Sequence, residues 1–457
     1  MRSYKPHMMI IISLFFLSAV GHSADATLKD DAYHYMKNGV DDNLYNEWWY
    51  FNGVGNDSQF LVVYLLSDPD NLTSSRKLQA LAVVLEDGRQ PAIGLRQSRG
   101  FGGDRDSPTF DLDQSGFSIQ EEPNLKVWGL VEDGISGAPI RWDLIYKPAV
   151  SPWFVMPVQS HVGHLKGDGM KWLAYMPSAN VTGKLTLGDR TLEINATGYH
   201  DHGWGRWALN DPQITWAQVS VPKDGFSLTL GDILGDGRST FLGIKYAGKT
   251  IQFSSKQIKL NYTAFAFDPA TARTYPAGYK LEAENGDYRL ELMIAAQRSV
   301  PLLVDYPLPM PSLLAFQQVS SLQGTLKSKS GEEYRFDETG FSGYTTHRLH
   351  PIFGRVNATQ AFSDAANITV TATNERTGQE KTEKTASEGW FSIDADYSDY
   401  LANSTAPWVA DGDRIRLEVS DGARRESSTI VSINMTEDSQ EARLDPLLLH
   451  AARPVIK

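Results

Sequence analysis

The sequence predicts an all-β protein built from antiparallel strands. Apolar and polar residues alternate with period two in most segments, and Val, Ile, Thr, Tyr and Trp dominate those segments. Turn residues recur every 8 to 12 positions, and no long amphipathic helix is evident. These observations are typical of barrels or sandwiches. The expected strands include residues 59–66, 78–85, 125–131, 140–146, 181–187, 191–197, 226–233, 240–246 and 288–295.

The length and composition indicate several domains. A chain of 457 residues exceeds what one hydrophobic core usually organises. Nine of the eleven tryptophans precede residue 220, and short polar strands follow from about residue 350. We therefore expect two β-domains over 27–208 and 209–347, and a small immunoglobulin-like β-sandwich over 348–457.

The N-terminus resembles a cleaved secretory signal over residues 1–26. Basic residues precede a short apolar run, and small residues follow it. The sequence also carries nine Asn-X-Ser/Thr sequons, which in an exported protein are glycosylation sites at the surface. They are Asn56, Asn71, Asn180, Asn195, Asn261, Asn357, Asn367, Asn403 and Asn434.

Charge and cysteine content exclude several classes of function. The formal charge of −12 disfavours nucleic acid and anionic membrane surfaces as partners. The absence of cysteine excludes thiol chemistry and Cys-based zinc sites. We expect a secreted or cell-envelope protein; peripheral contact with the envelope stays open.

Two aromatic clusters interleave tryptophans with titratable groups. The first is Glu47-Trp48-Trp49-Tyr50-Phe51, and the second runs from Gly198 to Trp207. A largely apolar pocket with a few aimed polar groups is the usual composition of a small-molecule site. In a strand, His200, His202 and Trp204 would share one face, and Tyr199, Asp201 and Gly203 the other.

These motifs resemble the carotenoid 1,2-hydratase family and its lipocalin-like relatives, which include the AttH proteins and fungal Diels–Alderases. The resemblance rests on Glu-Trp-Trp-Tyr-Phe at 47–51 and on Tyr-Met-Pro, Val-Thr-Gly and Gly-Tyr-His-Asp-His-Gly-Trp-Gly across 175–205. It covers about residues 30 to 347. The stretch after 350 resembles carboxypeptidase-regulatory or transthyretin-like modules.

The resemblance implies two lipocalin-like barrels in tandem that bind an apolar isoprenoid or lipid without a cofactor. Hydratases of this type protonate an isoprene C=C and add water to the carbocation. His202 and Trp204 match the family's catalytic His-x-Trp, and Asp232 is the nearest match to its acid. Leu230 stands where the family has Tyr. We expect substrate binding by Trp48, Trp49, Tyr50, Tyr199 and His200.

The chemistry sets a physical requirement on the acid. A free Asp carboxyl has a pKa near 3.9, so protonating an alkene near neutral pH needs an upward shift of about three units, or roughly 4 kcal/mol. An apolar wall supplies such a shift by disfavouring the charged form. Aromatic faces then stabilise the carbocation by about 0.5–2 kcal/mol each.

Other interpretations stay open at this stage. The aromatic residues are also ordinary barrel core, and Glu47, Asp201 and Arg206 are expected to form structural ion pairs. A pericyclase or cyclase, and a non-enzymatic carrier or cell-surface binder of apolar ligands, are the alternative functions. Zinc on His200 and His202, with His161 or His164 added, is the weakest alternative, and no metal is expected.

Overall fold

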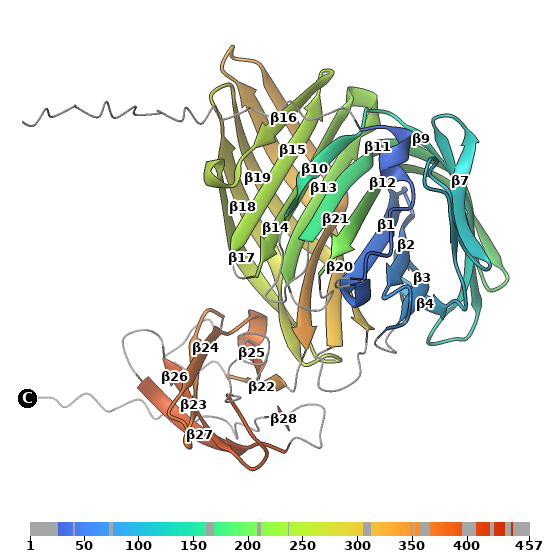
Figure 1. Cartoon of the computed structure of the whole chain (residues 1–457). Helices are drawn as coiled ribbons and strands as arrows, with labels where there is room; N and C mark the ends of the chain where they lie inside the picture. Colours follow the sequence, from blue (N-terminus) through green and yellow to red (C-terminus); the bar gives the residue numbers. More distant parts are fainter. Residues whose placement is uncertain are drawn as a thin grey trace, which may run out of the picture.

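We describe a computed structural model of the chain. It describes residues 26–39, 42–72, 76–160, 169–207, 212–235, 237–304, 312–348, 351–356, 366–394, 408–420, 425–434 and 440–441. The predicted signal sequence, apart from its last residue, lies outside these ranges. The described residues form two large curled sheets and two small sheets, all antiparallel except one short parallel pair (Figure 1).

The first barrel is a twelve-stranded sheet in the order β4-β3-β2-β1-β12-β11-β9-β8-β7-β6-β5, with β10 paired to β11. A bridge between Gly94 and Asp133 brings β4 against the end of β8, so the sheet curls onto itself. Its strands are β1 (Tyr45–Val54), β2 (Ser58–Ser67), β3 (Lys77–Glu86), β4 (Ala92–Gln97), β5 (Gly102–Gly103), β6 (Phe110–Leu112), β7 (Ser115–Glu121), β8 (Asn124–Glu132), β9 (Pro139–Pro148), β10 (Trp153–Ser160), β11 (Gly169–Leu187) and β12 (Arg190–Arg206).

The second barrel is a nine-stranded sheet in the order β16-β15-β14-β13-β21-β20-β19-β18-β17. Its strands are β13 (Gln213–Val221), β14 (Phe226–Leu234), β15 (Arg238–Tyr246), β16 (Lys249–Phe253), β17 (Ile258–Asp268), β18 (Arg273–Glu284), β19 (Tyr288–Val304), β20 (Ser312–Ser328) and β21 (Glu333–Arg348).

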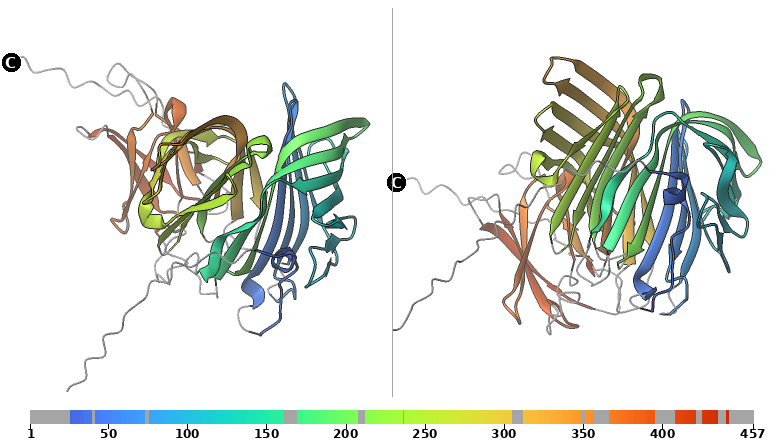
Figure 2. Two further views of the ribbon diagram at one scale, coloured as in Figure 1. Left: turned by 90° about the horizontal axis from the view of Figure 1, so that it is seen from above. Right: turned by 45° about the horizontal axis from the view of Figure 1, so that its top comes forward.

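The C-terminal part forms two small sheets around one apolar core. One contains β22 (Pro351–Arg355), β25 (Trp390–Asp394) and β28 (Gln440–Glu441), and the other β23 (Thr369–Asn374), β24 (Glu380–Lys384), β26 (Arg414–Ser420) and β27 (Arg425–Ser432). This sandwich packs on the second barrel, where Phe267 and Trp390 stack with ring centroids 4.4 Å apart and Arg273 pairs with Asp394 at 2.7 Å. Figure 2 shows it beyond the second barrel, on the side away from the first.

The helical elements of the described ranges are short 3-10 turns. They are η1 (Leu28–Asp31), η2 (Asp42–Leu44), η3 (Pro222–Asp224), η4 (Ser255–Gln257) and η5 (Ser387–Gly389). No helix in the described part of the chain is long and apolar enough to cross a membrane. The structure therefore confirms the predicted all-β class with two tandem curled sheets and a small additional sandwich.

Both barrels use the two faces of their strands differently. One face of each sheet fills its own barrel with apolar side chains, as the period-two pattern requires. The opposite faces of β1, β12, β13 and β14 meet in a third cluster between the barrels. This shared layer positions the candidate site.

Tryptophans of the first barrel pack against glycines of the second. A Cβ atom on Gly231 would lie 2.3 Å from the Trp172 ring, and one on Gly243 would lie 2.1 Å from the Trp153 ring. Only a residue without a side chain leaves room for these indoles. The Trp–Gly pairs therefore set how closely the two barrels approach.

Candidate functional site

The second sequence cluster distributes its side chains over two faces of β12, as predicted. His200, His202 and Trp204 point into the first barrel, whereas Tyr199 belongs to the layer between the barrels. The first cluster on β1 alternates likewise, so that Trp49 faces the barrel interior while Trp48 and Tyr50 face the second barrel. Two polar sites therefore arise from the same pair of strands.

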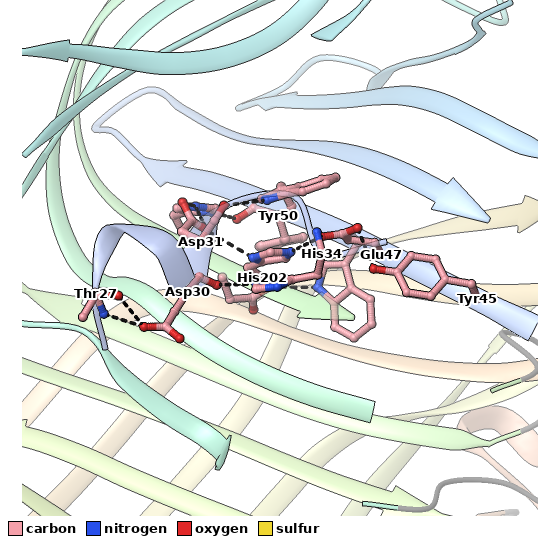
Figure 3. Close-up of polar contacts among 12 residues, drawn as sticks. Thr27, Asp30, Asp31, His34, Tyr45, Glu47, Tyr50 and His202 are labelled. Carbon is pink, nitrogen blue, oxygen red and sulfur yellow. Dashed lines mark hydrogen bonds and ion pairs between the residues drawn. The ribbon is translucent and has the colours of Figure 1, made fainter. Parts of the chain in front are cut away.

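The site inside the first barrel is a chain of buried charges (Figure 3). His202 Nε2 lies 3.0 Å from Glu47 Oε1, and His202 Nδ1 lies 3.4 Å from Asp31 Oδ1. Glu47 also accepts hydrogen bonds from the Tyr45 hydroxyl at 2.7 Å and the His34 backbone N–H at 2.9 Å. One imidazole is thus held between two carboxylates.

The electrostatics of this network favour the charged forms. Burial alone lowers the pKa of His202, but Asp31 and Glu47 outweigh it and raise that pKa to about 9. Burial pushes the pKa of Asp31 up, yet His200 and His202 together hold it below its ordinary value. His200 Nε2 lies 3.0 Å from Asp31 Oδ2. His202 and Asp31 are therefore held as paired, charged groups and are not poised to exchange protons with a substrate.

Aromatic rings enclose this network. Trp49 stacks on His202 at 4.7 Å, Phe51 stacks on His200 at 3.9 Å, and His34 stacks on Trp204 at 4.0 Å. His202 is fully buried and does not line the cavity between the barrels. Because Asp31 and His34 come from the segment before β1, the network fastens that segment to β1 and β12. We interpret it as structural.

The second site is a cavity between the barrels, with a volume of about 340 Å³. Its walls are mostly apolar: β2, β3 and β4 contribute aliphatic side chains on one side, and residues 301–304 and β20 contribute them on the other. Its aromatic lining consists of Trp48, Tyr50, Trp172, Trp207 and Trp216.

Asp201 is the one carboxylate among the described residues that line this cavity. It is 4% exposed and accepts hydrogen bonds from Trp48 Nε1 and the Tyr199 hydroxyl, both at 2.9 Å. Burial raises the pKa of Asp201 to about 6, against the opposing effect of the donors Trp48 and Tyr199. The pKa of Asp201 is therefore shifted in the direction that an acid requires, by less than the sequence argument asked for.

The predicted ion pairs around Arg206 are wrong. Arg206 donates to Asp42 Oδ1 at 2.8 Å and to the Met36 carbonyl at 2.8 Å, and its guanidinium lies over the Tyr45 ring. Asp201 bonds to Trp48 and Tyr199 instead. For Asp201 the physical reason is strand geometry, because residues five positions apart on β12 point to opposite faces. Glu47 shares the face of Arg206 but bonds to His202 and Tyr45 instead.

The structure does not bring Asp232 and His202 together. Asp232 lies on the β14 face that points into the second barrel, where Arg238 donates to it through Nε at 2.8 Å and Nη2 at 3.0 Å. Thr240 donates a further hydrogen bond at 2.7 Å. Asp232 is therefore occupied as a salt-bridge partner, and neither it nor His202 lines the inter-barrel cavity.

The predicted substrate-binding residues divide between the two sites. Trp48 and Tyr50 line the cavity, and the Tyr199 hydroxyl donates a hydrogen bond to Asp201. Trp49, His200 and Trp204 belong to the interior of the first barrel. The cavity residues Trp172, Trp207 and Trp216 were not predicted from the sequence.

Two further predictions concern metal binding and glycosylation. In the described ranges no group of three or more His, Asp or Glu side chains is placed to hold a metal ion, and His161 and His164 lie outside those ranges. Seven sequon asparagines are described, and six of them are exposed, as glycan attachment requires. These six are Asn56, Asn71, Asn180, Asn195, Asn261 and Asn367; Asn434 is half-buried, and Asn357 and Asn403 lie outside the described residues.

Comparison with known proteins supports the fold. No protein-family model and no curated protein matches the sequence. The structure is similar to a Nitrosomonas europaea protein assigned as an AttH, with 15% identity and a TM-score of 0.50 over 71% of this chain and 97% of that one. A structure of CghA matches with 13% identity and a TM-score of 0.45 over 71% and 97%. The first similarity shows a shared lipocalin-like fold.

Proposed function

We propose that this protein is a cofactor-free enzyme that hydrates a C=C bond of an apolar isoprenoid held between the two barrels. Asp201 acts as the acid in this proposal. The observation that carries it is a carboxyl group with a raised pKa in a cavity walled by indole rings. Inside the first barrel, by contrast, His202 forms ion pairs with Glu47 and Asp31.

The cavity suits a small apolar molecule. Its volume of about 340 Å³ lies within the range of roughly 300–1,000 Å³ that is usual for ligand sites. Aliphatic and aromatic side chains make up most of its lining, so filling it removes apolar surface from water. A prenyl or polyene chain offers the matching surface.

Asp201 is protonated often enough to serve as an acid near neutral pH. With a pKa of about 6, roughly one carboxyl in ten carries its proton at pH 7. A bound apolar ligand displaces most of the water around Asp201, which disfavours the carboxylate further. The protonated fraction therefore rises when substrate is present.

The reaction balances with Asp201 alone as acid and base. The Asp201 O–H bond breaks as the alkene π electrons form a C–H bond, leaving a tertiary carbocation and an Asp201 carboxylate. The faces of Trp48 and Trp216 attract that cation, by about 0.5–2 kcal/mol for each ring. Water then forms the C–O bond and returns a proton to the carboxylate. His202, on the opposite face of β12, is not required.

A cyclase is the second candidate, and the apolar lining favours it. The same protonation starts a cyclisation when a second C=C of the substrate, and not water, captures the cation. Where few polar side chains hold water, internal capture competes with hydration. The two reactions differ in whether solvent oxygen enters the product.

The test is incubation with prenyl substrates in heavy-oxygen water, followed by mass spectrometry of the products. A hydratase incorporates the label, and a cyclase yields an unlabelled isomer. Asp201→Asn should abolish either product yet retain binding, whereas Asp232→Asn should retain turnover as the matched control. Turnover that survives Asp201→Asn contradicts the proposal. Binding without turnover in every form identifies a carrier.

We further propose that the enzyme acts outside the cytosol, on prenyl lipids of the cell envelope or its surroundings. The N-terminal signal pattern and the exposed sequon asparagines support this location. Glycopeptide mass spectrometry of the protein from its native source tests it. Unmodified sequons on a protein that retains residues 1–26 would contradict it.

A further inference from the structure

Besides its aromatic residues, the cavity is lined by three uncharged polar side chains that the proposed reaction does not use. They are Gln79 on β3, Gln317 on β20 and Thr345 on β21. Within the described part of the chain, none of these three side chains makes a hydrogen bond with protein. Gln79 is only 8% exposed, and the Oε1 atom of Gln317 is buried without a partner. The buried Gln317 oxygen costs free energy unless a group in the cavity donates a hydrogen bond to it.

Gln79 lies away from the acid. Asp201 on β12 is followed across the sheet by β1, β2 and β3, in the register Asp201–Tyr50–Val63–Leu81. Gln79 is the next residue on the same face of β3. Neighbouring strands lie about 4.8 Å apart. Three strand spacings, plus the two residues from Leu81 to Gln79 along β3, place Gln79 about 15 Å from Asp201. On the facing wall, Gln317 lies two strands from β13, whose Trp216 contacts Tyr50 near the acid.

The charges around the cavity restrict the ligand further. Among the described residues that line it there is no Lys, Arg or His, and Asp201 is the one acidic side chain. A carboxylate or phosphate on the ligand would be buried without a cation, which is strongly unfavourable. The amide N–H groups of the glutamines and the Thr345 hydroxyl donate instead to a carbonyl or hydroxyl oxygen, and Gln317 Oε1 accepts from a hydroxyl group.

From this arrangement we propose that the ligand is a neutral, oxygen-bearing isoprenoid. Its ketone or hydroxyl group binds Gln79 and Gln317, and its chain extends about three isoprene units to the double bond at Asp201. The proposal rests on the proposed function, because it takes the cavity as the substrate site. It excludes pure hydrocarbons, fatty acids and prenyl phosphates as preferred ligands.

Three matched probes test this inference by calorimetric titration of the full chain. The first is farnesylacetone, whose ketone and terminal double bond are separated by a chain of comparable length. The second is its analogue with a methylene group in place of the carbonyl oxygen, and the third is farnesylacetic acid. We expect the ketone to bind about tenfold more tightly than the methylene analogue. The carboxylate should bind most weakly at pH 7.

Variants assign the preference to the glutamines. Gln79→Leu and Gln317→Leu should each remove most of the ketone preference and strengthen binding of the methylene analogue. Gln97→Leu is the matched control, because Gln97 pairs with Gln79 across β3 and β4 but does not line the cavity. It should leave the preference unchanged. A preference that survives both cavity variants overturns the inference.

The outcomes separate this inference from the proposed function. Ala315→Trp places an indole in the cavity and should block all three probes. If the three probes bind equally and Ala315→Trp blocks them, the cavity is the binding site and the oxygen-bearing ligand is wrong. If the carboxylate binds best, the neutral ligand is also wrong. If no probe binds, both the inference and the proposed function fail.

Discussion

The charge on Asp201 should cost the folded protein stability at neutral pH. The pKa of this carboxyl is raised from its ordinary 3.8 to about 6 in the folded chain because it is buried. Below pH 3.8 the group is protonated in both states and contributes nothing. Between the two pKa values the unfolded chain loses its proton first, which favours unfolding. A shift of about two units, at about 1.4 kcal/mol per unit, makes the full cost about 3 kcal/mol above pH 6.

Asp201→Asn removes the titrating charge and keeps the shape of the side chain. Urea unfolding of both proteins, followed by tryptophan fluorescence from pH 4 to pH 8, measures the difference in unfolding free energy. All other titrating groups cancel in that difference. The variant should gain about 3 kcal/mol relative to the wild type across this range, with most of the change between pH 4 and pH 6. A difference that is flat with pH, or that has the opposite sign, would refute the assignment of Asp201.

The remaining predictions concern the buried network, the barrel contact and the reaction. The pKa of His202 is raised to about 9, so protonated His202 stabilises the folded protein fully below pH 6.5 and this contribution is lost as pH rises through 9. The melting temperature of His202→Gln should lack this decline with pH. Gly231→Ala places a Cβ atom 2.3 Å from the Trp172 ring and should lower the free energy of unfolding by about 1–3 kcal/mol. Gly237→Ala is the control: its Cβ atom meets no atom within 4 Å, so the melting temperature should stay unchanged. Turnover should fall as pH rises above 6, about tenfold per unit, and Asp232→Asn should show the same pH–rate profile; a rate that rises with pH would exclude Asp201 as the acid.

The fold followed from the sequence because its main signal is local. Alternation with period two identifies strands and their faces, and on β12 it correctly separated His200 and His202 from Asp201. Turn spacing and the scarcity of helical patterns completed the all-β prediction. The family resemblance then supplied the tandem arrangement, which no local pattern contains.

The site could not be read in the same way because it lies between elements far apart in the sequence. Trp172, Trp216 and residues 301–304 meet Asp201 only through the contact of two barrels. The prediction also gave weight to histidines, whereas the structure pairs His202 with Glu47 and Asp31. One sequence signal did point to this site. By the period-two alternation, Tyr199 and Asp201 lie on one face of β12, and Trp48 lies on the same face of the neighbouring strand β1.

The most direct test of the account is the titration of the Asp201 carboxyl carbon by NMR, assigned by its absence in Asp201→Asn. The midpoint should lie near pH 6 in the free protein. It should be higher when farnesylacetone fills the cavity, because the ligand removes water from the carboxylate. A midpoint near pH 4, unchanged by the ligand, would contradict the claim that an apolar chamber between the barrels holds the catalytic acid.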